Sequence, residues 1–176
     1  MKKIYLIVIL FIISINLYSQ NITFENFVVK RKTEMFRRDT YYIGQVKSRT
    51  AFTELISLFT YENIKEYGGY KNVFKLYDEN IDLYFNETEV FTLIEIKIKT
   101  DEYELYKSLI KVGDNIDTII KTYPNWFVNY NDEKKFYFAE LEDFTNEFED
   151  SVFYNISLQV ENNIIKNIIL YYSFAL

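Results

Sequence analysis

Acidic side chains give this chain its widest choice of chemistry. Six carboxylates fall within residues 140–150, separated by Phe144 and Phe148: Glu140, Glu142, Asp143, Glu147, Glu149 and Asp150. Carboxylate oxygens are the ligands that calcium prefers, and two carboxylates on either side of a glycosidic bond can hydrolyse it. The stretch lacks the alternating Asp/Asn and glycine spacing of a calcium-binding loop, and nothing selects one catalytic pair from 26 acids. We therefore expect a solvated loop here, with no metal site and no catalytic residue.

Two residue types that often do chemistry are missing, because the chain has no histidine and no cysteine. Their absence excludes Ser-His-Asp and Cys-His catalysis, histidine-ligated zinc, thiolate metal sites and disulfides. The four glycines form no phosphate-binding loop. The sequence therefore predicts a non-enzymatic protein without a cofactor, and a hydrolase that uses carboxylates is the chemical alternative.

The first twenty residues have the three-part layout of a secretory signal peptide. Lys2 and Lys3 form a positive start, residues 4–13 are an unbroken apolar run, and the small Ser19 precedes the expected cleavage site. A permanent anchor needs roughly 20 apolar residues, and this run is shorter. We expect cleavage after residues 1–20, export to the periplasm or the cell exterior, and no stable membrane anchor afterwards. A retained anchor and a buried core strand are the alternatives.

The charge of the mature chain limits its partners. The expected signal peptide carries two lysines and no acids, so its removal changes the formal net charge from −6 to −8. Nucleic-acid phosphates and anionic membrane surfaces would repel such a chain, so we expect no nucleic-acid partner. A protein partner is favoured, because 17 tyrosines can provide a large contact area at low entropic cost. Codon bias in an AT-rich genome would explain the same aromatic content.

The rest of the chain divides into an extension and two similar units. Residues 21–41 predict an N-terminal extension or edge strand, whose basic residues either guard the edge or bind a partner. Residues 42–107 and 108–176 each begin with a glycine-containing turn, at Gly44 and Gly113, and continue with a helix and an antiparallel meander. The expected fold class is α+β, with two similar units that each pack a helix on an antiparallel β-meander.

The two expected helices have apolar residues at helical spacing. These positions are Phe52, Leu55, Ile56 and Phe59 in one helix and Ile116, Ile119, Ile120 and Tyr123 in the other. Residues suited to capping precede each run: Ser48 or Thr50, and Asp114 or Asn115. Pro124 ends the second helix, and Gly68 with Gly69 breaks the corresponding stretch of the first unit.

Extended segments follow each helix and are separated by polar turns. In the first unit they are residues 72–77 and 81–85 around the turn 78–80, and then 90–99. In the second unit they are residues 126–130 and 135–141 around the turn 131–133, and then 152–160 and 164–173 around the turn 161–163. Apolar and polar residues alternate along these segments, as expected for half-buried strands.

The start of the second unit resembles known envelope domains. The stretch from Val112 to Pro124, VGDNIDTIIKTYP, places a glycine and a polar cap before an amphipathic helix and a proline near its end. It is similar to the SmpA/OmlA-type outer-membrane assembly domain and to the repeat of the tandem β-lactamase inhibitor proteins. The resemblance implies two helix-on-sheet layers side by side and a protein partner gripped by the sheets or loops. The chain departs from the assembly factors because it lacks their lipidated cysteine.

Strand alternation predicts one aromatic surface on the side of the sheets that faces away from the helices. The partner-binding residues predicted in this way are Tyr84, Phe91, Tyr137 and Phe153. An aromatic cluster with a polar rim is typical of protein-binding surfaces. The alternative is that this face is covered by the N-terminal extension or by the other unit.

Together these features predict an exported, non-enzymatic binding protein whose partner is a protein. Its role would be that of an inhibitor, an immunity-type protein or an envelope assembly factor. The alternatives are an exported carbohydrate- or lipid-binding protein, with Trp126 and Tyr130 stacking on sugar rings, and the carboxylate-dependent hydrolase.

Overall fold

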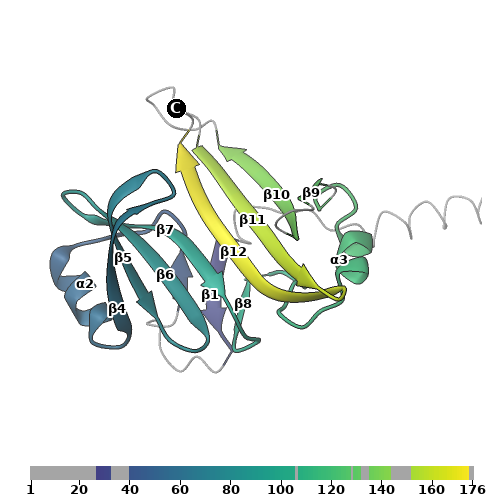
Figure 1. The fold of residues 1–176 in the computed structure, drawn as a ribbon, viewed down its shortest axis with the longest axis horizontal. Helices are drawn as coiled ribbons and strands as arrows, with labels where there is room; N and C mark the ends of the chain where they lie inside the picture. Colours follow the sequence, from purple (N-terminus) through teal and green to yellow (C-terminus); the bar gives the residue numbers. More distant parts are fainter. Residues whose placement is uncertain are drawn as a thin grey trace, which may run out of the picture.

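The computed structural model describes residues 27–32, 40–105, 107–127, 129–131, 135–143 and 152–174 (Figure 1). In chain order the elements are β1 (Val28–Arg31), β2 (Thr40–Tyr42), β3 (Val46–Lys47), α2 (Arg49–Ile56), β4 (Thr60–Tyr67), β5 (Tyr70–Tyr77), β6 (Ile81–Glu87), β7 (Phe91–Ile98), β8 (Tyr103–Leu105), α3 (Ile116–Thr122), β9 (Asn129–Asn131), β10 (Phe136–Asp143), β11 (Val152–Glu161) and β12 (Ile164–Phe174). The expected signal peptide and residues 144–150 of the acidic stretch lie outside the described residues. None of the described helices has the length and apolar character needed to span a bilayer.

One antiparallel sheet contains nine of these strands. Its order is β4-β5-β6-β7-β12-β11-β10-β9, and the short β3 pairs with the start of β7. β7 pairs with β12, with Ile98 opposite Ile168 and Ile96 opposite Leu170. In Figure 1 the blue-to-teal strands β4–β7 and the green-to-yellow strands β9–β12 form the two sides of this sheet. Both halves of the chain therefore belong to one sheet.

Residues with a positive φ form the tight turns between neighbouring strands. Asn162 and Asn163, with φ of 53° and 62°, join β11 to β12, as expected for a two-residue hairpin turn of this kind. Gly68 and Gly69, with φ of 55° and 85°, join β4 to β5 in the same way. The prediction that the glycine pair breaks a helical stretch is therefore wrong, because the pair turns the chain between two strands.

A second layer covers one face of the large sheet. It consists of the small sheet β2-β1-β8 and of helices α2 and α3, which lie at opposite ends of the molecule in Figure 1. Val29 and Leu105 of the small sheet, Phe52 of α2 and Ile119 of α3 all join a single core with the strands of the large sheet. Burying these side chains against one sheet face is what holds the two layers together.

Local signals at the helix ends agree with the sequence. Ser48 Oγ accepts a hydrogen bond from Ala51 N and caps α2, and Asn115 Oδ1 accepts one from Asp117 N and caps α3. Gly113 has a φ of 94°, a backbone conformation that residues other than glycine rarely adopt. These predictions are confirmed, although both helices end earlier than expected, at residues 56 and 122.

The predicted α+β fold of two helix–meander units is wrong. The described chain is mostly β, with two short helices and one large antiparallel sheet. The pairing of β7 with β12 merges the strands of both predicted units, and the tandem repeat is not supported. Helices of eight and seven residues are too short to cover a sheet of this size, so the small sheet covers much of the same face.

Candidate functional site

The aromatic residues predicted to bind a partner do not form one surface. Tyr84 is 7% exposed and belongs to a small buried cluster with Val73 and Ile94. Phe91 is 3% exposed and stacks on Phe52 of α2 in the main core, with 3.8 Å between the ring centroids. A partner could reach Phe91 only by opening that core.

The other two predicted residues lie on the β9–β12 side of the sheet. Tyr137 is half-buried, packs against the main core, and has its ring centroid 4.5 Å from that of Tyr130. Phe153 belongs to β11, and its side chain is not among those that the structure describes. The role of the four residues in partner binding stays a prediction. Trp126, proposed above to stack on sugars, packs partly buried against the main core.

A β-bulge explains why the expected alternation fails along β7. The pairing of β6 with β7 shifts between Tyr84 and Phe85, so Ile94 is an extra residue in β7. An extra residue reverses the side of the sheet on which the preceding side chains lie. Phe91 therefore points into the main core together with Leu93, Ile96 and Ile98, whereas Ile94 packs on the opposite face.

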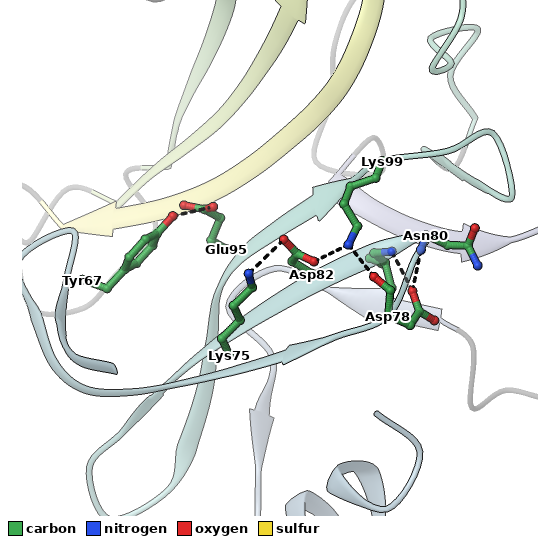
Figure 2. Close-up of polar contacts among 8 residues, drawn as sticks. Tyr67, Lys75, Asp78, Asn80, Asp82, Glu95 and Lys99 are labelled. Carbon is green, nitrogen blue, oxygen red and sulfur yellow. Dashed lines mark hydrogen bonds and ion pairs between the residues drawn. The ribbon is translucent and has the colours of Figure 1, made fainter. Parts of the chain in front are cut away.

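That opposite face carries a network of charged side chains (Figure 2). The buried Asp82 of β6 lies between two lysines, with Lys99 Nζ at 2.7 Å from Oδ1 and Lys75 Nζ at 3.4 Å from Oδ2. Lys99 Nζ also donates to the main-chain oxygen of Asp78, and Lys75 Nζ lies 5.6 Å from the ring centroid of Tyr84. Each of these charged side chains has an oppositely charged neighbour within the network, so we assign the network a structural role.

Two tyrosines hold the β4–β5 hairpin over the same face. Tyr67 stacks on Tyr84 with 4.5 Å between ring centroids, and its hydroxyl donates to Glu95 Oε1 at 2.8 Å. The Tyr70 hydroxyl donates to the main-chain oxygen of Tyr172 at 3.1 Å. Burial raises the pKa of the Glu95 carboxyl, although the hydrogen bond from Tyr67 acts in the opposite direction. Burial and the neighbouring Glu95 raise the pKa of the Tyr67 hydroxyl, which keeps it protonated as a donor.

A groove of about 840 Å³ lies between α2 and the turn that joins β2 to β3. Its volume falls within the range of roughly 300–1,000 Å³ that is usual for ligand sites. We call it the α2 groove. The residues that matter for its chemistry are Tyr42, Gln45, Lys47, Glu54 and Leu58.

Backbone contacts fix one wall of the α2 groove. Gln45 N donates to the main-chain oxygen of Tyr42 at 2.9 Å, and Gly44 between them has a φ of 76°, which favours glycine. Gly44 N donates to the main-chain oxygen of Leu93 at 2.7 Å, and Leu93 N donates to that of Gln45 at 2.9 Å. Lys47 follows in β3, which pairs with β7. The wall is therefore tied to the centre of the large sheet.

Two polar side chains of the α2 groove have no partner among the described residues. The Lys47 side chain is half-buried, no carboxylate in the described ranges lies within ion-pair distance of it, and burial lowers its pKa. Gln45 Oε1 is buried and accepts no hydrogen bond from the described part of the chain. Buried polar atoms in native proteins are normally paired. These two atoms therefore mark the groove as a place where a ligand would complete the contacts.

Exposed apolar side chains border the same groove. Leu58, just beyond the end of α2, is 59% exposed, and Tyr42 of β2 is 50% exposed. A concave surface that combines apolar side chains with a few polar groups is the usual composition of a binding site. The α2 groove is therefore the candidate functional site.

Two of the described residues that line the groove, Glu54 and Lys47, have side chains that can transfer a proton. Glu54 and Lys47 are not within ion-pair distance of each other. Within the described ranges, no three potential metal ligands lie together. That the protein has no catalytic residue, metal or cofactor stays a prediction.

Comparison with protein-family models, curated proteins and solved structures found no match to this chain. The resemblance to envelope assembly domains and to β-lactamase inhibitor repeats therefore stays a prediction. Function must be argued from the chain's own residues.

The groove residues are not among those that the sequence singles out. Gln45 and Lys47 follow Gly44, whose turn the sequence indicates, but whether a lysine has an acidic neighbour depends on tertiary contacts. Leu58 offers a local signal, because it is a large apolar residue that lies outside the helical pattern Phe52, Leu55, Ile56 and Phe59. An apolar residue off the buried face of a helix is a reason to look for a partner.

Proposed function

We propose that this chain is an exported, non-enzymatic protein-binding module that holds an extended segment of its partner in the α2 groove. The observation that carries the proposal is the pair of groups without partners in the described chain, Lys47 Nζ and Gln45 Oε1, in a groove bordered by Tyr42 and Leu58. Export is supported by the signal-peptide pattern of residues 1–20.

A polypeptide can supply every kind of group that the groove needs. Its backbone N–H groups can donate to Gln45, its acidic side chains or C-terminus can pair with Lys47, and its apolar side chains can pack on Leu58 and Tyr42. Buried apolar and aromatic anchors carry much of the free energy of protein association. Inhibitors, immunity-type proteins and envelope assembly factors all act through such contacts, and the proposal covers these roles.

Site-specific photo-crosslinking in the host that exports the protein tests this proposal. A benzophenone amino acid is placed at Leu58, in the groove, or at Leu109, a matched control that is 56% exposed and lies near α3 at the other end of the fold. We expect a covalent protein adduct at position 58 that an excess of unmodified chain abolishes, and none at position 109.

The chemical nature of the adduct decides the outcome. A saturable adduct that mass spectrometry identifies as a polypeptide supports the proposal. A glycan or lipid adduct at position 58, equal labelling at both positions, or labelling that excess unmodified chain does not reduce would each contradict it.

A further inference from the structure

We propose that the α2 groove selects an acidic segment, with a carboxylate of the partner pairing with Lys47 Nζ and a backbone N–H of the same segment donating to Gln45 Oε1 once the Gln45 side chain turns toward the groove. This inference rests on the proposed function and specifies the chemistry of the partner. The occupant is an extended polypeptide segment that carries a carboxylate between apolar side chains.

Other half-buried lysines of this fold have a carboxylate partner, which Lys47 lacks among the described residues. Lys75 and Lys99 are also half-buried, and both lie against the carboxylate of Asp82. Lys47 has no such neighbour in the described part of the chain. Removing an ammonium from water without a counter-charge is unfavourable, and burial accordingly lowers the pKa of Lys47. A carboxylate brought by a partner would offset this cost.

The charge of the groove is opposite to the charge of the chain as a whole. Among the described residues that line the groove, Lys30 and Lys47 are basic and Glu54, whose side chain is exposed, is the one acid. Lys30 takes part in another interaction, so Lys47 is the charge that a partner would meet. The chain has a formal net charge of −6, which becomes −8 once residues 1–20 are removed. A basic groove in an acidic protein attracts an acidic segment and leaves the rest of the surface to repel it, so charge complementarity selects where the segment binds.

The two polar groups are also placed to act together. Gln45 and Lys47 are two residues apart, and both side chains line the same groove. Hydrogen bonds between this backbone and Leu93 hold both residues against the large sheet before any ligand arrives. A backbone that is already fixed loses little conformational freedom on binding, which favours affinity. Tyr42 and Leu58 then receive the apolar side chains that flank the carboxylate.

Selection from a random peptide library tests the inference without knowledge of the natural partner. The complete chain, exported and processed by its host, is used to select displayed peptides of about ten residues, with a crosslinker at Leu58 to report occupancy of the groove. We expect Asp and Glu to be enriched among groove-bound peptides, and a synthetic acidic peptide from the selection to bind roughly 10-fold more weakly to Lys47→Met than to the unmodified chain. Lys47→Arg should keep most of the affinity.

Control variants and a salt series separate this effect from misfolding. Lys166→Met removes an exposed lysine of β12 and should leave peptide affinity unchanged. Circular dichroism should show that Lys47→Met remains folded, and higher salt should weaken the acidic peptide more than a Glu→Gln version of it. Groove-bound peptides without acidic enrichment would overturn this inference while leaving the proposed function intact. A library in which no peptide reaches the groove would overturn both.

Discussion

The charged network around Asp82 allows a direct test of how burial changes the strength of an ion pair. Lys99 Nζ lies 2.7 Å from Asp82 Oδ1, and Arg49 Nη2 lies 2.7 Å from Glu87 Oε1, so the two pairs have the same separation. Their side chains differ in exposure, at 27% and 7% for Lys99 and Asp82 and at 75% and 25% for Arg49 and Glu87. Burial is the main difference between the two pairs, beside the second lysine at Asp82 and the arginine in place of a lysine at Glu87.

The expected magnitudes follow from these exposures. Breaking a fully buried pair by removing one partner costs about 3–5 kcal/mol. We take a lower value of about 2–3 kcal/mol for Asp82→Asn, because Lys75 and Lys99 can still turn toward water. The exposed pair of Arg49 and Glu87 should contribute only about 0.2–1 kcal/mol.

Double-mutant cycles measured by urea denaturation provide the assay. One cycle uses Asp82→Asn with Lys99→Met, and the matched cycle uses Glu87→Gln with Arg49→Met. Lys99 also donates to the main-chain oxygen of Asp78, but this loss occurs in both arms of the cycle and cancels. For a domain of this size, Asp82→Asn should lower the Tm by about 4–12 °C, since each kcal/mol corresponds to roughly 2–4 °C.

Two results would refute this reasoning. Equal coupling energies in the two cycles would show that burial does not strengthen the Asp82 pair. A coupling that falls steeply with added salt around Asp82, as for an exposed pair, would show that water reaches the network.

Three further predictions concern stability. The pKa of Glu95 is raised in the folded state, so folding favours the protonated carboxyl. The free energy of unfolding should therefore decrease as the pH rises from about 4.3, the pKa in the unfolded chain, through the folded pKa. Glu95→Gln should flatten this decrease in urea titrations across that range. Phe52→Ala removes a ring that packs on three others in the core and should cost about 3–5 kcal/mol, measured by the same titrations at neutral pH. Ile119→Ala should lower the free energy of unfolding by about 2–5 kcal/mol, because Ile119 belongs to the core. Asn115→Ala, which removes the α3 cap, should lower it by only about 0.5–2 kcal/mol. A larger loss of stability for Asn115→Ala would contradict the assignment of Ile119 to the core.

The hairpin turns at residues 78–80 and 161–163 could be predicted because their signals are local, whereas the turn at Gly68 and Gly69 was misread. The Asp78 carboxylate accepts hydrogen bonds from Asn80 N at 2.7 Å and Ile81 N at 2.8 Å, so the turn between β5 and β6 is encoded within four residues. The paired asparagines between β11 and β12 act in the same local way. Helix caps and turn residues can be read from sequence for the same reason, since the groups that bond are neighbours in the chain.

The architecture could not be predicted, because it depends on which distant segments pair. β7 and β12 are separated by about half the domain, and their pairing turns two predicted units into one sheet. The small sheet is built from strands of three or four residues, too short to show a periodicity. The bulge at Ile94 adds a second obstacle, because it reverses the alternation on which the prediction of Phe91 as an outward residue depended.

The candidate site could not be predicted from the sequence for a related reason. A lysine is a candidate binding residue when the fold buries it without a counter-charge. The sequence around Lys47 indicates neither its burial nor the lack of a counter-charge. Lys75 and Lys99 have equally ordinary surroundings in the sequence, yet the fold pairs both with Asp82. The distinction between a structural and an available lysine therefore arises only when strands distant in sequence are brought together.

Several tyrosines have a structural role in the folded chain, where the sequence had suggested a binding role. Tyr67, Tyr70 and Tyr84 each use a ring or a hydroxyl to hold the β4–β5 hairpin over strands β6, β7 and β12 of the same sheet, in a protein that has no cysteine to form a disulfide. A tyrosine suits this task because its ring provides apolar contact and its hydroxyl satisfies a polar atom at the edge of the core. Tyrosine content by itself therefore does not identify a binding surface here. What identifies one is the combination at the α2 groove of an exposed aromatic, Tyr42, with polar groups such as Lys47 that the described fold leaves without partners.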